Sequence, residues 1–150
     1  MDFGKLLFSP EGRIGQGQFW IGFLILFVGG ILIHLVPIAG TLVWLLSTYC
    51  WVCLFAKRLH DMGKSGFLQV WFYLFDLMAI GALILGGFGS ILAGLLTGGG
   101  HMTWGLVAGG LGLLFLAFCA IALSKLILVL WLGLSPGQSV DNRYGPVPAG

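Results

Sequence analysis

The 150-residue chain is too apolar for a soluble domain. Apolar residues make up 59% of it and charged residues only 8%, whereas a soluble domain carries about 25% charged residues. Disordered chains are poor in apolar and aromatic residues, so disorder is excluded as well. The formal net charge of +2 is too small to indicate a nucleic-acid partner. The composition therefore predicts a polytopic membrane protein.

The first long apolar segment runs from residue 18 to residue 56 and holds no charged residue. It is about twice the ~20 residues that cross a ~30 Å hydrocarbon core. Pro37 lies near its middle, and proline suits a helix start while forcing the preceding residue out of the helical conformation. We therefore expect two helices, over about 18–36 and 38–56, joined by a tight turn.

Two further apolar segments predict helices over about 67–96 and 105–133. Each exceeds a perpendicular span, and tilt or projection beyond the lipid would absorb the excess. Three consecutive glycines at 98–100 weaken a helix and predict the turn between them. The tail over 134–150 is rich in proline and is expected to be non-helical. The expectation is thus an all-α membrane protein: residues 1–150 form one domain of four transmembrane helices in two antiparallel hairpins.

The basic residues predict the orientation of these helices. A four-span topology puts six of them on the same side of the membrane, namely Lys5, Arg13, Lys57, Arg58, Lys64 and Arg143. The two turns on the opposite side contain no lysine or arginine. By the positive-inside rule, the charged side and both termini are expected to be cytoplasmic.

Three polar motifs stand out against the apolar background. In chain order they are GRIGQGQFW at 12–20, KRLHDMGKSG at 57–66 and DNRYGPVP at 141–148. Together, in this order and around four spans, they make the chain resemble the DUF805 family of small bacterial inner-membrane proteins. The resemblance covers essentially the whole chain and implies the architecture and the compartment, a multi-pass location in the inner membrane. It implies no activity, because that family has none established.

Two features depart from the family pattern. Gln16 and Gly17 stand where further basic residues usually follow the first arginine, and the second hairpin is longer and richer in glycine.

The loop from Arg58 to Gly66 is the densest polar region. Its Gly63-Lys64-Ser65 ends like a phosphate-binding P-loop, but Arg58 stands where that motif needs a glycine. Two interpretations remain. In one the loop is an interfacial turn whose basic residues meet anionic lipid headgroups; in the other it forms a cytoplasmic polar cluster with the tail. The residues of this predicted cluster are Arg13, Arg58, His60, Asp61, Lys64, Asn142, Arg143 and Tyr144.

No catalytic, metal or cofactor site is predicted. His60 adjoins Asp61, but no second histidine or cysteine stands nearby at the spacing of metal ligands. No serine occupies a nucleophile-elbow motif. Cys50, Cys53 and Cys119 all lie in apolar sequence, and an odd number of such thiols does not indicate a disulfide framework.

Small residues at four-residue intervals predict close helix packing. They are Ala82, Gly86, Ser90, Gly94 and Gly98 in the third expected helix, and Gly105 and Gly109 in the fourth. Such residues let the backbones of transmembrane helices approach closely. The partner is either the other helix of the same hairpin or a second molecule.

Asp76 and Lys125 are the only charged residues inside the expected spans. They lie equally far from the turn centred between residues 100 and 101, so an antiparallel hairpin sets them at equal depth. We expect an intramembrane ion pair, which offsets the cost of burying each charge alone. In the alternative, Lys125 extends to the membrane surface and Asp76 is protonated.

The sequence leaves two classes of function. One is a non-enzymatic interaction or accessory subunit, either in a larger membrane complex or in a homo-oligomer. The other is a small transporter or lipid-handling protein that uses the Asp76–Lys125 pair, because ionisable residues inside a membrane are candidates for function. In both, the expected contacts are membrane lipids and not nucleic acid.

Overall fold

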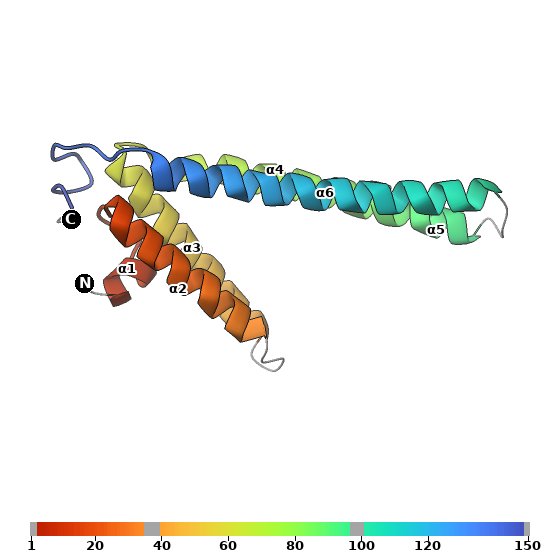
Figure 1. The fold of residues 1–150 in the computed structure, drawn as a ribbon, viewed down its shortest axis with the longest axis horizontal. Helices are drawn as coiled ribbons and strands as arrows, with labels where there is room; N and C mark the ends of the chain where they lie inside the picture. Colours follow the sequence, from red (N-terminus) through yellow and green to blue (C-terminus); the bar gives the residue numbers. More distant parts are fainter. Residues whose placement is uncertain (1–2, 35–39, 97–100, 149–150) are drawn as a thin grey trace. The chain divides into compact units, whose positions relative to one another are not determined.

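The chain is all-helical in the computed structural model, which describes residues 3–34, 40–96 and 101–148. Figure 1 shows the helices in sequence colours. In order they are α1 (Phe3–Phe8), α2 (Gln16–His34), α3 (Gly40–Asp61), the 3₁₀ turn η1 (Gly66–Leu68), α4 (Gln69–Ala82), the π-helical η2 (Leu83–Phe88), α5 (Gly89–Leu96) and α6 (His101–Leu134). They form two compact units: unit 1 holds the chain up to Gln69 together with Val129 onward, and unit 2 runs from Val70 to Leu128.

The predicted helices correspond to observed ones with shifted ends. The largest difference is at the end of α3, which continues through Asp61 instead of ending near residue 56. The helical conformation therefore includes Lys57, Arg58 and His60. The two predicted turns, at Pro37 and at glycines 98–100, lie outside the described residues.

Among the residues that the structure describes, two helical segments are long and apolar enough to cross a membrane. They are Gly66–Leu96, with 31 residues, and Gly105–Leu134, with 30 residues. At about 1.5 Å per residue each is about 45 Å long, which exceeds a ~30 Å hydrocarbon core. A shorter apolar helix covers Gln16–Leu32.

Unit 1 is built on the packing of α2 against α3. Phe19 is fully buried in this contact, and Phe23 meets Trp51 edge to face with 5.3 Å between ring centroids. A Cβ atom at Gly22 would stand 2.6 Å from Leu54 Cδ1. Glycine at this position therefore lets the two helices approach closely enough for the aromatic rings to interlock.

Unit 2 is a pair formed by α4, η2 and α5 on one side and α6 on the other (Figure 1). The buried residues of α6 in this unit include Gly110, Ala117 and Ser124, and their seven-residue spacing is the seam expected of coiled-coil-like packing. A Cβ at Gly110 would lie only 2.7 Å from the carbonyl oxygen of Gly87. The two backbones thus approach each other closely at Gly87 and Gly110.

The predicted glycine face is only partly correct. In the first helix of the pair, Gly94 is buried, but Ala82 is exposed and the buried glycine of the next turn is Gly87, not Gly86. Gly86 and Gly87 both lie in η2, where a π-helical turn takes in an extra residue, so the buried position departs from the four-residue spacing.

In α6, the two predicted glycines do not make the contact within the hairpin. Gly105 and Gly109 are exposed, and a Cβ at either would meet nothing within 4 Å. The contact is made one position later, at Gly110, because the packing follows the seven-residue seam rather than the four-residue spacing of small residues. Gly98 lies outside the described residues.

This contact yields a test with a matched control. Gly110→Leu should destabilise the protein by about 1–3 kcal/mol, because the side chain would be forced into the backbone of η2. Gly109→Leu adds the same side chain where there is open space and should leave stability unchanged. Thermal unfolding in detergent measures both, and equal destabilisation by the two variants would contradict the packing described.

Candidate functional site

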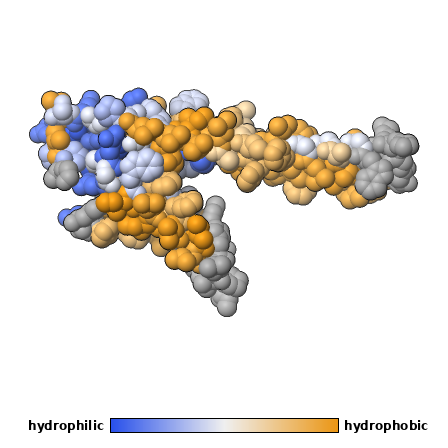
Figure 2. All heavy atoms as spheres, in the orientation of Figure 1, coloured by the Kyte–Doolittle hydropathy of each residue, from blue (hydrophilic) through white to orange (hydrophobic). Residues whose placement is uncertain are grey.

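Polar residues gather at one end of unit 1, and apolar residues cover the length of α2, as the hydropathy colours of Figure 2 show. The centre of this polar cluster is the carboxylate of Asp61 at the end of α3. Its Oδ1 accepts from Arg13 Nε at 3.2 Å and Nη2 at 3.1 Å, and its Oδ2 forms an ion pair with Arg58. All three side chains are at most 4% exposed. One buried carboxylate thus holds two buried guanidinium groups.

Arg58 ties the end of α6 to the segment before α2. It donates from Nε to the carbonyl of Leu132 at 2.9 Å and from Nη1 to the carbonyl of Ile14 at 3.3 Å, and Nη2 donates to Ser135 O. The last carbonyls of a helix have no partner within it. Arg58 donates hydrogen bonds to these carbonyls at the end of α6, so it holds α6 against the rest of unit 1.

Arg13 fixes the tail in the same way. It donates from Nη1 to the carbonyls of Val140 at 2.8 Å and Gly145 at 3.2 Å, and Nη2 also donates to Gln138 O. The backbone N–H of Gln138 in turn donates to Asp61 O at 2.8 Å. At Gly137, a Cβ would collide with Oδ2 of Asp61. The tail therefore reaches the carboxylate only because that residue is glycine.

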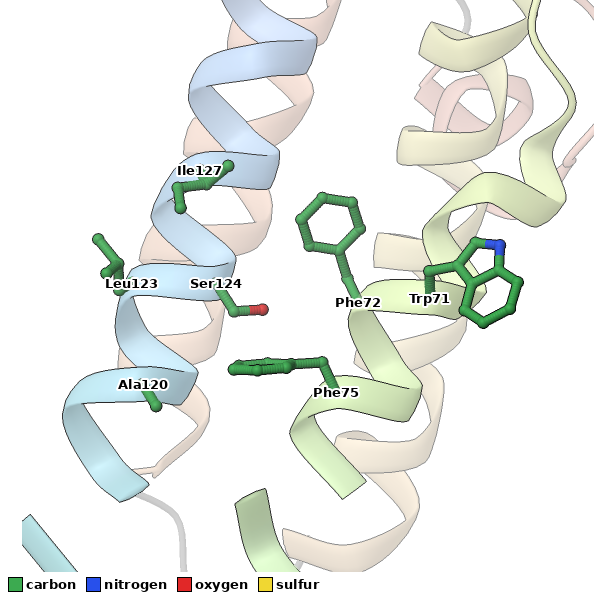
Figure 3. Close-up of a pocket in the computed structure, with 7 residues that line it drawn as sticks. All are labelled: Trp71, Phe72, Phe75, Ala120, Leu123, Ser124 and Ile127. Atoms are coloured by element: carbon green, nitrogen blue, oxygen red, sulfur yellow. The ribbon is translucent and has the colours of Figure 1, made fainter. Parts of the chain in front are cut away.

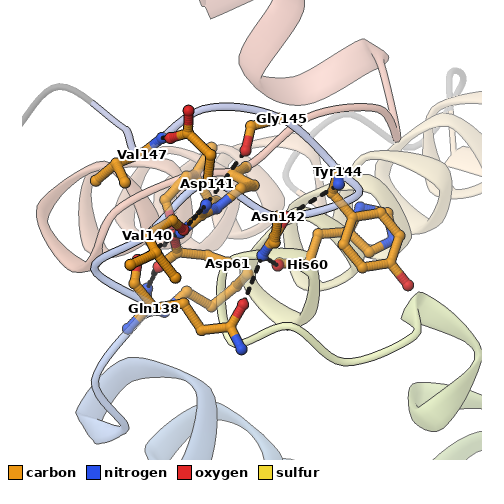
Figure 4. A network of polar contacts seen from close by, with 12 residues as sticks. His60, Asp61, Gln138, Val140, Asp141, Asn142, Tyr144, Gly145 and Val147 are labelled. Carbon is orange, nitrogen blue, oxygen red and sulfur yellow. Dashed lines mark hydrogen bonds and ion pairs between the residues drawn. The ribbon is translucent and has the colours of Figure 1, made fainter.

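His60 makes a second contact with the tail (Figure 4). Its ring stacks on Tyr144, with centroids 3.9 Å apart and planes within 7°, and Nδ1 donates to Gly12 O at 3.2 Å. Asn142 Nδ2 donates to His60 O at 3.0 Å. Burial is the main cause that lowers the pKa of His60; the Gly12 bond acts against it, while the charge of Arg143 lowers that pKa further.

The structure brings together seven of the eight residues of the predicted cluster. Arg143 completes it by donating to the Tyr144 hydroxyl at 2.6 Å. Lys64 instead lies over the ring of Trp131, with Nζ 4.7 Å from the centroid. Because Arg58 is fully buried, it contacts the tail and α6 rather than lipid headgroups.

Gln16 and Gln138 also belong to the cluster, although the sequence did not predict a role for either. Gln16 Nε2 lies 3.1–3.3 Å from the carbonyl oxygens of Gly133, Leu134 and Ser135, so it caps the end of α6. The only sequence signal for Gln16 is its place in the first polar motif, and Gln138 has none. Within the described residues, no group of three or more histidine, cysteine or acidic side chains could hold a metal ion.

Unit 2 contains a separate polar network within apolar helices. Lys125 of α6 forms an ion pair with Oδ2 of Asp76 in α4. Ser124 Oγ donates to Oδ1 of Asp76 at 3.1 Å, and Lys125 Nζ lies 4.2 Å from the ring centroid of Tyr73. The Asp76 carboxylate thus also contacts the Ser124 hydroxyl, and the Lys125 ammonium also contacts the Tyr73 ring.

An apolar groove of about 370 Å³ runs beside this network (Figure 3). Its lining consists of Trp71, Phe72 and Phe75 from α4 and Ala120, Leu123, Ser124 and Ile127 from α6. The polar side-chain groups of this lining are the indole N–H of Trp71 and the hydroxyl of Ser124, and the hydroxyl is bonded to Asp76.

A double-mutant cycle tests the ion pair. Asp76→Asn should cost about 1–3 kcal/mol of stability, because it removes the countercharge of Lys125, whose side chain is 38% exposed. The double variant Asp76→Asn/Lys125→Met should recover part of this loss, since it removes the unpaired charge. The readout is unfolding in detergent. If the single variant is no less stable than the double variant, the pair does not stabilise the hairpin.

The sequence of the chain is similar to a protein family and to two curated relatives. Residues 7–146 match the family described as "Protein of unknown function (DUF805)". The chain is 28% identical to "Uncharacterized protein YiiR" of Escherichia coli K12 and of Escherichia coli O157:H7, over 97% of its own length and 89% of theirs. No solved structure matches the chain. The family match covers the first two polar motifs, residues 141–146 of the third and most of both units, and the chain therefore belongs to the DUF805 family.

Proposed function

We propose that the chain is an integral protein of the bacterial inner membrane with four spans and cytoplasmic termini, and that it acts as a non-enzymatic interaction or accessory subunit. The observation that carries the topology is the cluster around Asp61. It joins the segment before α2, the end of α3 and the segment after α6. Because these three segments meet in one cluster, each hairpin must begin and end on the same side of the membrane.

The charges support the same orientation. The cluster contains Arg13, Arg58 and Arg143, and Lys64 lies in the same unit over Trp131. An excess of basic residues on one side of a membrane protein is typical of the cytoplasmic side.

The surfaces of the long helices support contact with lipid. In an apolar 18-residue stretch of Gly66–Leu96 only 11% is buried. In the corresponding stretch of Gly105–Leu134 only 17% is buried. A helix in the core of a soluble protein would be mostly covered. Leu85 and Leu96, for example, are 81% and 77% exposed, which suits a surface solvated by acyl chains.

The role of a subunit is supported by how the polar groups are used. The guanidinium groups of Arg13 and Arg58 donate to Asp61 and to backbone carbonyls, so they serve to hold helices and tail. The cluster pairs no nucleophile with a base, which an enzyme of the acid–base or nucleophilic class would need. On α6, Gly105 and Gly109 leave open space that the helix of a partner protein could approach closely.

One observation favours a second candidate, a small transporter or lipid-handling protein. The Asp76–Lys125 pair lies within apolar helices, and Ser124 joins it to a groove. Ionisable residues at such a position are often part of a substrate pathway.

Mild detergent extraction of the tagged protein separates the two candidates. Reporter fusions after residues 36, 60, 100 and 150 first check the topology, which should read outside, inside, outside, inside. A subunit should then co-purify in fixed stoichiometry with a different membrane protein. A homo-oligomer that carries bound lipid and no other chain would favour the second candidate, and an outside reading at residue 60 would overturn the topology.

A further inference from the structure

The buried part of unit 1 holds more positive than negative charge. Arg13 and Arg58 share the single carboxylate of Asp61. Lys57 is only 3% exposed, and none of the ion pairs formed by the described residues includes it. A buried cation without a countercharge is costly, and burial indeed lowers the pKa of Lys57. Unit 1 therefore favours an anion from outside.

Lys57 is held at the end of α1 by neutral acceptors. Its Nζ donates to Leu6 O at 2.9 Å and to Lys5 O. An ammonium group has three N–H donors, so these two carbonyls leave one donor for another acceptor. The carbonyls fix the position of the ammonium without neutralising it.

A hollow of about 720 Å³ lies at this position. It is bordered by α1, the segment before α2, the start of α2 and Lys57 of α3. Its lining includes three cations, Lys5, Arg13 and Lys57, but one acid, Glu11, and the hydroxyl of Ser9. Pockets for small ligands commonly have volumes of about 300–1,000 Å³, so the hollow has room for a charged headgroup.

We propose that this hollow binds the phosphate of an anionic phospholipid headgroup, with Lys57 as its main countercharge. Exposed apolar residues on α1 and α2, the two helices that border it, favour a lipid over a free anion. Phe3 and Phe8 of α1 are each 51% exposed, and Ile21 and Leu24 of α2 are 45% and 56% exposed. Such apolar side chains give the acyl chains of the same lipid a surface to lie on. The inference rests on the proposed membrane location.

The experiment uses the full-length protein, stripped of lipid in a neutral detergent. Phosphatidylglycerol, phosphatidylcholine and inorganic phosphate are titrated separately, and the rise in the midpoint of thermal unfolding gives an apparent affinity. Phosphatidylglycerol should bind at least about tenfold more tightly than phosphatidylcholine, which corresponds to about 1.4 kcal/mol. Inorganic phosphate should not reproduce its effect.

Variants identify the site. Lys57→Met should weaken phosphatidylglycerol binding about tenfold, since it removes a charge-assisted hydrogen bond. Lys64→Met removes the same charge from the neighbouring loop, where Lys64 lies over Trp131, and should leave the affinity unchanged. Glu11→Gln removes the acid at the hollow and should strengthen binding. That variant tests the site even if Lys57→Met fails to fold.

Four results would each overturn the proposal. Equal binding of the two lipids would exclude selectivity for an anionic headgroup. Equal losses in Lys57→Met and Lys64→Met, or no gain in Glu11→Gln, would indicate diffuse attraction instead of a site. A full effect of inorganic phosphate would identify a soluble anion as the ligand. The reporter fusions and the co-purification test the proposed function, and their outcomes do not depend on any of these results.

Discussion

The carboxylate of Asp61 is the constraint on which unit 1 depends. Two guanidinium groups, from Arg13 and Arg58, converge on it out of contact with water. Each arginine then uses its remaining donors on backbone carbonyls of the tail, the end of α6 and the segment before α2. Breaking a buried ion pair by removing one partner is strongly destabilising, because the other charge stays buried. Removing this one carboxylate would therefore release contacts in four segments of the chain.

In unit 2, an ion pair and close backbone packing hold the helices together. Its helices are apolar on all sides, so apolar contacts alone specify their register weakly. The Asp76–Lys125 pair and the Ser124 hydroxyl join α4 to α6 at one depth, and the two backbones also approach each other closely at Gly87 and Gly110. Close packing of small residues and hydrogen bonds between helices are the interactions available to helices in lipid.

The all-helical fold and the family were readable from the sequence, because long apolar segments and three ordered motifs need no tertiary information. The meeting of Asp76 and Lys125 follows from simple symmetry about a turn. The burial of Gly87 instead of Gly86 did not follow, because both lie in the π-helical turn over Leu83–Phe88, which has no clear sequence signature. In α6 the contact at Gly110 instead of Gly109 follows the seven-residue seam, whereas the prediction used the four-residue spacing of small residues. The capping role of Gln16 and the countercharge of Arg13 depend on contacts between residues 48 to 119 positions apart, which spacing along the chain does not reveal.

The stability of Asp61→Asn against that of Asp141→Asn tests the central claim most directly. Asp141 is exposed and its Oδ1 accepts one backbone N–H, from Val147, so the two variants make the same chemical change in a buried and an open position. Thermal or denaturant unfolding at neutral pH should show a loss of about 3–5 kcal/mol for Asp61→Asn and almost none for Asp141→Asn. Equal stability of the two variants would show that the buried carboxylate does not hold unit 1 together.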